Sequence, residues 1–251
     1  MIDNDIIKDF KPISLEEMGK VRLMNRIDTK YVTTIDKVNE LLRAASPDYL
    51  IQQIDGRVNM PYYTKYFDTS DVDMFYQHQR GKKNRQKVRI RKYEESDTLP
   101  FVEIKTKNNK GLTRKKRVAM DSGADIIQYI DFLNTHSRYN PIDLIPHIEN
   151  HFYRITLVNK EMTERITIDT NVEFHNLTTG KTVSFENIGI IEWKRDGNND
   201  KSRFDKILRD LRIQKSGFSK YCIGMAVTNP DLRQNRLKKR IRMINRIDPF
   251  M

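Results

Sequence analysis

Arginine and lysine side chains recur at every second position in several short segments of the sequence. Lys87, Arg89 and Arg91 alternate with two apolar residues, and charged and apolar positions alternate in the same way around 102–105 and 191–194. In an extended strand such residues point to opposite faces, one charged and one apolar. Arginines two residues apart can bind successive phosphate groups through their planar guanidinium groups. These segments therefore predict an anion-binding face.

The same alternation is typical of any antiparallel sheet that exposes one face to water. Several strands together favour another arrangement, because their polar faces carry Arg and Lys with isolated Glu rather than a mixture of small polar groups. If the sheet closes into a barrel, the apolar faces point outward against helices and the charged faces line the interior. An interior filled with Arg and Lys repels itself unless an anion occupies it. The pattern thus predicts a polyanion site inside a barrel.

The positive charge of the chain is concentrated in two places. The 251 residues include 46 Lys and Arg and 34 Asp and Glu, for a net charge of +12. Residues 80–117 contain fifteen basic and four acidic residues, and 233–246 contain seven basic and no acidic residues, which leaves the rest of the chain net negative. A uniformly basic coat for nucleic acid would not leave an acidic remainder. The distribution favours a local polyanion site and makes nucleic acid an unlikely partner.

Eight segments with a period of two must position these residues. We predict strands at 26–33, 62–68, 86–93, 100–107, 112–120, 152–159, 163–170 and 187–195. Helical spacing predicts helices at 35–45, 124–134 and 202–213, the last of which Ser202 can cap. The expected fold is α+β, an eight-stranded antiparallel β-barrel with helices packed outside.

Residues 1–229 are expected to form one domain and residues 230–251 a basic, helical C-terminal tail. The tail suits either anionic lipid headgroups or a helix that caps the mouth of a barrel. No run approaches the roughly 18 apolar residues of a membrane span, the N-terminus has no apolar signal segment, and the single cysteine, Cys222, fits a reducing compartment. We therefore expect a cytoplasmic protein. Peripheral contact of the tail with the inner face of the membrane is an alternative that the sequence leaves open.

Eight motifs carry a resemblance that covers about residues 26–225. They occur in family order at 26–31, 66–69, 87–93, 101–105, 153–154, 165–169, 191–194 and 218–221. The chain resembles the catalytic domain of the vacuolar transporter chaperone (VTC) polyphosphate polymerases, within the CYTH-like triphosphate tunnel metalloenzyme superfamily. Two departures stand out. Arg26-x-Asp28-x-Lys30 replaces the Glu-x-Glu-x-Lys of the hydrolase and cyclase branches, which favours the VTC branch, and Phe152 replaces the tyrosine of the family's Tyr-x-Arg.

The resemblance implies an eight-stranded tunnel that binds triphosphate or polyphosphate. In this family a divalent metal, Mn²⁺ or Mg²⁺, assists phosphoryl transfer from a nucleoside triphosphate such as ATP onto a growing inorganic polyphosphate chain. The matching motifs also imply a substrate-binding set, which comprises Arg26, Lys87, Arg154, Arg165, Lys194 and Ser219.

Phosphoryl transfer depends mainly on positioning and on neutralising the phosphoryl oxygens. A catalytic set follows from that requirement, namely Arg89 and Arg91 as planar grips and Lys30, Lys105 and Lys220 as point charges. Glu192 is the expected ligand of Mn²⁺ or Mg²⁺, since such a metal on a triphosphate needs only one or two protein carboxylates. The alternative for Glu192 is an ion pair with Lys194 or an arginine, and Glu103 is expected to be a counter-ion of that kind.

The predicted activity is that of an ATP:polyphosphate phosphotransferase. An anionic phosphate acceptor needs no general base, and the five histidines show no ligand spacing. A tripolyphosphatase or nucleoside triphosphatase on the same scaffold is one alternative, in which water replaces the phosphate acceptor. A binding module for polyphosphate or nucleic acid, without turnover, is the other.

Overall fold

The computed structural model describes residues 1–19, 21, 26–94, 98–109, 113–197 and 202–250. Its main feature is an antiparallel path of eight strands, in the spatial order β2 (Arg26–Thr34), β11 (Ile188–Asp196), β9 (Glu164–Asn176), β8 (Ile145–Asn159), β4 (Met60–Asp68), β5 (Arg85–Tyr93), β6 (Phe101–Lys107) and β7 (Thr113–Ala119). Three short strands extend this sheet, namely β1 (Lys11–Ile13), β3 (Tyr49–Gln52) and β10 (Thr182–Phe185). The predicted α+β class and the eight antiparallel strands are confirmed.

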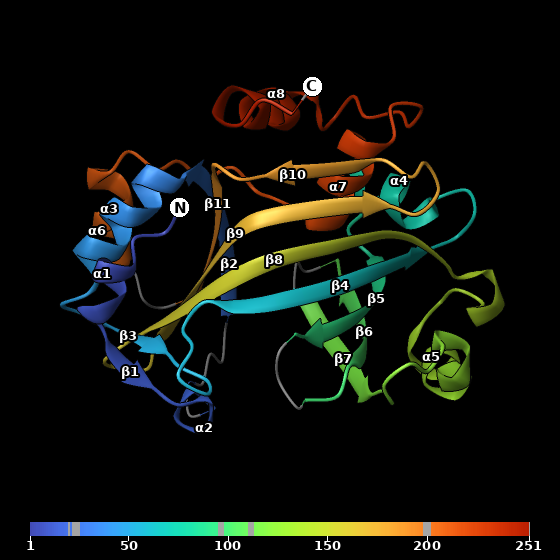
Figure 1. Ribbon diagram of the computed structural model, residues 1–251. Coiled ribbons are helices and arrows are strands. Elements are labelled where there is room, and N and C mark those ends of the chain that lie inside the picture. The colour runs from blue at the N-terminus through green and yellow to red at the C-terminus, as the bar shows by residue number, and fades with distance from the viewer. Residues whose placement is uncertain (20, 22–25, 95–97, 110–112, 198–201, 251) are drawn as a thin grey trace.

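The eight strands curl strongly into a half-barrel (Figure 1). Lys105 on β6 and Glu192 on β11 interact electrostatically across its concave side, although four strands separate them in the sheet. Within the ranges described, no pairing joins β7 to β2, so the expected closed barrel is not shown. β7 carries four consecutive cations, 114–117, and charge on both faces of a strand is typical of a sheet edge.

Three helices cover the convex side near β2, namely α1 (Asn4–Lys8), α3 (Ile35–Ala45) and α6 (Arg203–Asp210). The apolar face of β11 packs there, and the ring of Trp193 lies 5.5 Å from that of Phe204 on α6. Ser202 caps α6 by accepting a hydrogen bond from the Phe204 amide at 3.0 Å. The two helices predicted at 35–45 and 202–213 are confirmed. The segment predicted at 124–134 forms a 3₁₀ turn followed by α5 (Ile130–His136).

A bulge in β9 changes which of its residues face the concave side. Asn171 has a φ of +48°, and Phe152 on β8 lies opposite the point where β9 contains an extra residue. A bulge of this kind reverses the alternation of the strand beyond it. Asp169 before the bulge and Val172 and Phe174 after it therefore share the concave face. Beyond the bulge, that face is apolar rather than charged.

Helix α7 (Lys220–Thr228) packs on this apolar part of the concave face. The expectation that helices lie outside the sheet holds for the convex helices, whereas α7 lies inside. A Cβ at Gly224 would lie 2.5 Å from Cδ1 of Phe174 and 2.7 Å from Cδ1 of Ile148, so the glycine permits a close approach. All residues of α7 after Lys220 are buried, and Cys222 among them has no exposed surface.

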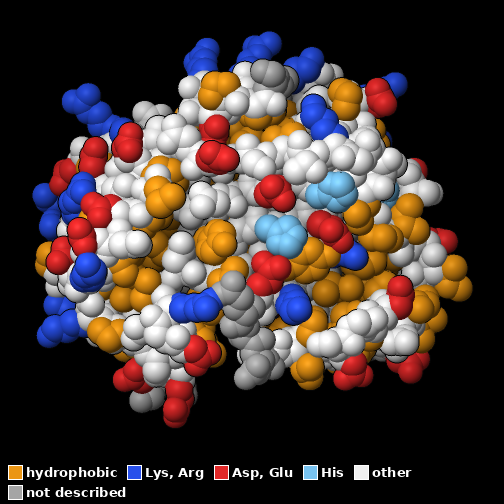
Figure 2. Space-filling model, viewed as in Figure 1, with side chains coloured by type: hydrophobic (Ala, Val, Ile, Leu, Met, Phe, Trp, Pro, Cys, Tyr) orange, Lys and Arg blue, Asp and Glu red, His pale blue; other side chains and the backbone are white. Residues whose placement is uncertain are grey.

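The basic tail forms α8 (Lys238–Ile247), above β10 in Figure 1. Leu237, Ile241 and Ile244 are buried against the rest of the protein, so the apolar side of the tail is used within the fold. Its Lys and Arg side chains are exposed, and Figure 2 shows basic side chains at this end of the molecule. The remaining helical elements are α2 (Leu15–Met18), α4 (Asp73–Gln79), η1 (Ile126–Tyr129) and η2 (Pro141–Asp143). None of the helices described is long and apolar enough to cross a bilayer.

We expect Gly224→Ala to lower the free energy of unfolding by about 2–3 kcal/mol, because the added methyl group overlaps Phe174 and Ile148 in a packed interior. Urea denaturation followed by circular dichroism measures this loss. Gly56→Ala is the matched control, since nothing lies within 4 Å of a Cβ there and only its positive φ resists the change, at a cost of about 1 kcal/mol. A smaller loss at Gly224 than at Gly56 would contradict the packing of α7.

Candidate functional site

Three carboxylates on the concave side are each shared between two cations. The groups are Glu103 with Arg89 and Lys115, Asp169 with Arg154 and Lys220, and Glu192 with Lys30 and Lys194. We call these residues, together with the concave cations Lys87, Arg91, Lys105 and Arg165, the cationic face. On β5, β6, β9 and β11 most of its charged residues alternate with buried apolar residues that face the convex side, as the sequence predicts.

Glu103 is almost completely buried, with 1% of its surface exposed. Nη2 of Arg89 lies 2.5 Å from one carboxylate oxygen, and Nζ of Lys115 lies 3.2 Å from the other. Burial alone would raise the pKa of Glu103, but the charges of Arg89, Arg91 and Lys115 lower it below its ordinary value. Glu103 is therefore a charged counter-ion, as predicted, and it fixes the orientation of Arg89.

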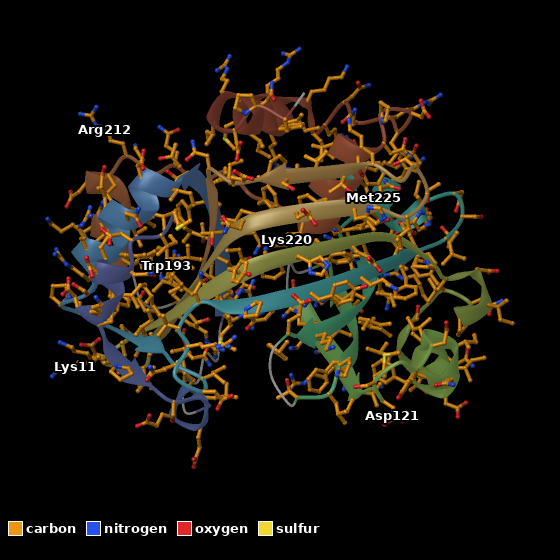
Figure 3. The ribbon with its side chains drawn as sticks, viewed as in Figure 1. Lys11, Asp121, Trp193, Arg212, Lys220 and Met225 are labelled. Atoms are coloured by element: carbon orange, nitrogen blue, oxygen red, sulfur yellow. The ribbon has the colours of Figure 1, made fainter. Side chains whose placement is uncertain are left out.

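Asp169 holds a second arginine in place. Arg154 donates two hydrogen bonds to it, from Nε at 2.5 Å and from Nη2 at 2.8 Å, and Lys220 donates a third. Burial lowers the pKa of the Lys220 ammonium group to about 7, even though Asp169 favours the charged form. Lys220, the first residue of α7, lies beside β8 and β9 in Figure 3. Lys220 therefore loses its proton more readily than an ordinary lysine, although it is held as the ion-pair partner of Asp169.

Aromatic rings lie beneath these cations. The rings of Tyr62 and Phe152 stack at 5.2 Å, and the guanidinium carbon of Arg154 lies 4.9 Å and 5.2 Å from their respective centroids. Nζ of Lys220 lies 4.1 Å from the centroid of Phe152. Cation–π attraction of this kind requires a ring face and no hydroxyl group. Phenylalanine at 152 can therefore support both cations.

Glu192 lies between two lysines near the edge of the curled sheet. It lies opposite Lys30 in the pairing of β11 with β2 and accepts hydrogen bonds from Lys30 and Lys194. Burial alone would raise the pKa of Glu192, but Lys194, Lys30 and Lys105 together hold it well below its ordinary range. Burial lowers the pKa of Lys194 to about 8, even though Glu192 opposes this. In this structure the alternative interpretation of Glu192, an ion pair with Lys194, is realised.

The donor set around Glu192 decides how a divalent metal could bind. Among the residues described, no three His, Cys, Asp or Glu side chains gather as a metal site. Glu192 offers one carboxylate, and each of its oxygens now holds an ammonium group. Mg²⁺ and Mn²⁺ often bind through one or two carboxylates and take their other ligands from substrate phosphates. Glu192 fits a metal that arrives with phosphate oxygens and not one held by protein alone.

Four cations of the cationic face have no carboxylate within ion-pair distance in the part of the chain that the structure describes. They are Lys87, Arg91, Lys105 and Arg165. The Nε atoms of Arg91 and Arg165 are buried, and no described residue offers either of them a hydrogen-bond acceptor. The charge of Arg89, then burial, then the charge of Arg91 lower the pKa of Lys105 well below its ordinary value. Buried donors of this kind suit an anion that the protein itself does not supply.

The remaining predicted residues lie at the margins of the cationic face. Arg26 is half-exposed and pairs with Asp28, its Nε 2.7 Å from a carboxylate oxygen. Ser219 caps α7 by accepting a hydrogen bond from the Cys222 amide at 3.2 Å and accepts another from Nζ of Lys87 at 2.7 Å. Ser219 thus joins the start of α7 to β5.

The sequence interpretation assigned no role to Asp169, Lys115 or Tyr62. A signal for Asp169 existed, because it continues the alternation of Arg165 and Thr167 along one face of a strand. Lys115 could not be chosen in this way, since its neighbours on both sides are also basic.

A family model described as the VTC domain matches residues 25–229, a range that includes every residue of the cationic face. The chain belongs to the VTC domain family. VTC domains have the triphosphate tunnel, or CYTH-like, fold, and membership supports a polyphosphate-related function. The resemblance recognised in the motifs is therefore confirmed.

Comparison with other proteins adds little about the chemistry of this VTC domain. No curated protein matches it. The structure of the PH1819 protein from Pyrococcus horikoshii matches with a TM-score of 0.47 and 13% identity, over 80% of this chain and 98% of that one. The Mediator head module of Schizosaccharomyces pombe matches with a TM-score of 0.39 and 9% identity, over 80% of this chain and 94% of that one. Both scores are below 0.5, so the chemistry rests on the residues of this VTC domain.

Arg89 pairs with Glu103, whereas Arg91 has no ion pair among the residues described. We therefore expect replacement of these two arginines to change the free energy of unfolding by different amounts. Arg89→Ala leaves the buried Glu103 with Lys115 alone, and breaking a buried pair costs about 3–5 kcal/mol of unfolding free energy. Arg91→Ala should change that free energy by less than about 1 kcal/mol, because it removes repulsion with Arg89 and Arg154. Urea denaturation of both variants tests this, and equal losses would contradict the distinction.

The lowered pKa of Lys220 predicts that triphosphate binds this VTC domain more weakly as the pH rises through about 7. Only the ammonium form attracts the anion, so bound triphosphate should raise the pKa of Lys220. At a pH above the pKa of the free protein, binding should therefore be accompanied by uptake of a proton. Calorimetry of triphosphate in two buffers with different ionisation enthalpies measures the uptake. Lys220→Arg stays charged throughout and is the control; an uptake as large as that of the wild type in this variant would show that another group titrates.

Proposed function

We propose that this VTC domain is a polyphosphate polymerase that transfers the terminal phosphoryl group of a nucleoside triphosphate such as ATP to the end of an inorganic polyphosphate chain. The observation that supports this most is the cationic face, where buried arginine donors have no acceptor among the residues that the structure describes. An anionic acceptor oxygen attacks the γ-phosphorus, the bond to the β-phosphate oxygen breaks, and the nucleoside diphosphate leaves. The chain's terminal oxygen is already deprotonated, so this transfer needs no general base.

The residues of the cationic face divide into two groups by their partners. Arg89 and Arg154 are held by Glu103 and Asp169 and can present fixed donors without losing side-chain entropy on binding. Arg91, Lys105 and Arg165 have no such partner in the described ranges and are the cations that phosphate oxygens would neutralise. Preorganised donors aimed at phosphoryl oxygens are the main source of catalysis in reactions of this class.

The half-barrel would serve as the wall of a tunnel around the bound chain. Lys87 on β5 interacts electrostatically with Lys30 on β2, and Lys105 on β6 with Glu192 on β11. The β5–β6 side of the half-barrel therefore already faces the β2–β11 side. A polyanion between them would cancel the repulsion among these cations and favour a smaller gap between β7 and β2.

Glu192 would hold Mg²⁺ or Mn²⁺ together with phosphate oxygens. When bound, the metal would add positive charge at the phosphoryl group and so help to neutralise it. Lys30 and Lys194 would then be free to contact phosphate instead of Glu192.

The test is to incubate the purified protein with ATP and Mn²⁺ and to resolve the phosphate products by gel electrophoresis. Long chains are the expected product. Free phosphate alone would indicate a hydrolase, and binding without turnover would indicate a binding module; either result would contradict the polymerase.

Glu192→Gln keeps the size of the side chain and removes its charge. We expect it to abolish metal-dependent turnover while triphosphate binding, measured by calorimetry, stays intact or becomes tighter, since one negative neighbour of the polyanion is gone. Glu149→Gln is the matched control, because Glu149 pairs with Lys65 at 2.9 Å on the other face of the sheet. Turnover of Glu192→Gln at the wild-type rate in saturating Mn²⁺ would place the metal elsewhere.

A further inference from the structure

A second hollow with positive charge lies between α4 and the segment that joins α7 to α8. It has a volume of about 410 Å³. We call it the arginine pocket; it is lined by Tyr76, Gln79, Arg80, Arg233, Asn235 and Arg236. None of these lining residues belongs to the cationic face.

Three guanidinium groups line the arginine pocket and no carboxylate does. Arg236 donates from Nη1 to the Gln79 carbonyl oxygen at 3.0 Å, and the guanidinium carbon of Arg80 lies 6.0 Å from the ring centroid of Tyr76. Neither these two arginines nor Arg233 has an ion-pair partner in the part of the chain described. Arginine forks that share one cavity without a counter-ion are suited to planar or tetrahedral oxyanions.

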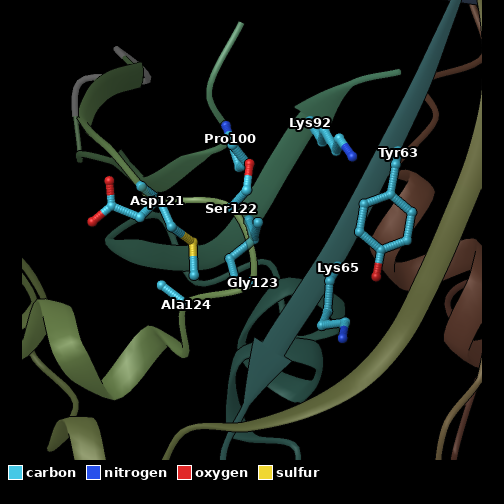
Figure 4. Close-up of a pocket in the computed structure, with 10 residues that line it drawn as sticks. Tyr63, Lys65, Lys92, Pro100, Asp121, Ser122, Gly123 and Ala124 are labelled. Carbon is cyan, nitrogen blue, oxygen red and sulfur yellow. The ribbon is translucent and has the colours of Figure 1, made fainter. Parts of the chain in front are cut away.

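Another hollow of the molecule shows the contrast (Figure 4). That cavity, of about 240 Å³, lies beside β4 and β5 on the face opposite the cationic face. It also has two cations in its lining, Lys65 and Lys92, but Asp121 lines it as well and Lys65 is paired with Glu149. Charge in that cavity is largely balanced, whereas charge in the arginine pocket is not.

The arginine pocket is joined to the cationic face by further cations. Arg240 lies four residues after Arg236 in the sequence. Its Nε donates a hydrogen bond to the carbonyl oxygen of Ser216 at 3.2 Å, and Ser216 precedes Ser219 by three residues. Ser219 in turn contacts Lys87 of the cationic face. Lys87, Arg85 and Arg240 all act electrostatically on His78 in α4. Positive charge therefore continues from one site to the other.

We propose that the arginine pocket is a second binding site for an oligophosphate group, separate from the cationic face. The choice of an oligophosphate as the ligand rests on the proposed function, whereas the site itself rests on the geometry and charge of the pocket. The oligophosphate is either a distant part of a chain whose other part lies on the cationic face, or the triphosphate of a second nucleotide.

Calorimetry at fixed ionic strength tests the proposal, with inorganic triphosphate, ATP and long-chain polyphosphate as probes. The wild type should bind two triphosphates. Arg80→Ala combined with Arg233→Ala should remove one of them, or weaken it by at least roughly tenfold, because charge-assisted hydrogen bonds are lost. Lys239→Ala combined with Arg242→Ala removes the same charge from exposed positions of α8 outside the pocket. This matched control should change each affinity by less than about twofold.

A single triphosphate per wild-type protein, or equal losses in the two double variants, would overturn the proposal, because the binding would then reflect diffuse charge. Arg91→Ala tests the cationic face separately. If only the pocket variant loses a triphosphate site, the arginine pocket is a binding site and the proposed function of the cationic face is wrong. If only Arg91→Ala loses a site, the cationic face binds triphosphate and the proposal for the arginine pocket is wrong. A larger loss for long chains than for triphosphate would identify a chain that spans both sites, and a loss confined to triphosphate and ATP would identify a nucleotide.

Discussion

The concave side of the sheet holds more positive than negative side chains, and these cations repel one another. The rest of the structure depends on the ion pairs that offset this repulsion. Each of three carboxylates is shared by two cations from different places in the chain. Glu103 connects β5, β6 and β7, Asp169 connects β8, β9 and α7, and Glu192 connects β2 and β11. Since a buried ion without a partner costs several kcal/mol, these contacts hold the strands in register. The cations left over are the ones available to a ligand.

The bulge at Asn171 determines where this charged surface ends. Without it, the side chains after Asp169 would keep the same alternation, and Val172 and Phe174 would point to the convex side. With it, they form an apolar surface on which α7 packs, so the helix begins beside the charged residues and brings Lys220 to Asp169. One extra residue in a strand therefore sets both the limit of the site and the position of one of its cations.

The strands could be predicted from the sequence because alternation is a local property, and the same alternation indicated which side chains share the charged face. Helix α7 could not be found in this way, since a helix buried on all sides has no amphipathic period. The difference between Arg89 and Arg91 was also out of reach, because it depends on the strand opposite: Glu103 reaches one arginine and not the other. Alternation also says nothing about the missing pairing of β7 with β2 in the ranges described, because a closed and an open sheet have the same period of two.

The burial of Cys222 makes the chain's one thiol a natural reporter on α7. Its side chain has no exposed surface, and burial raises the pKa of the thiol, so little reactive thiolate forms while the helix is in place. An alkylating reagent can reach the sulfur only when α7 moves away from β8 and β9, and the labelling rate therefore counts such openings without any attached dye. Because Lys220 begins the same helix, that rate also measures how often one wall of the charged surface comes apart.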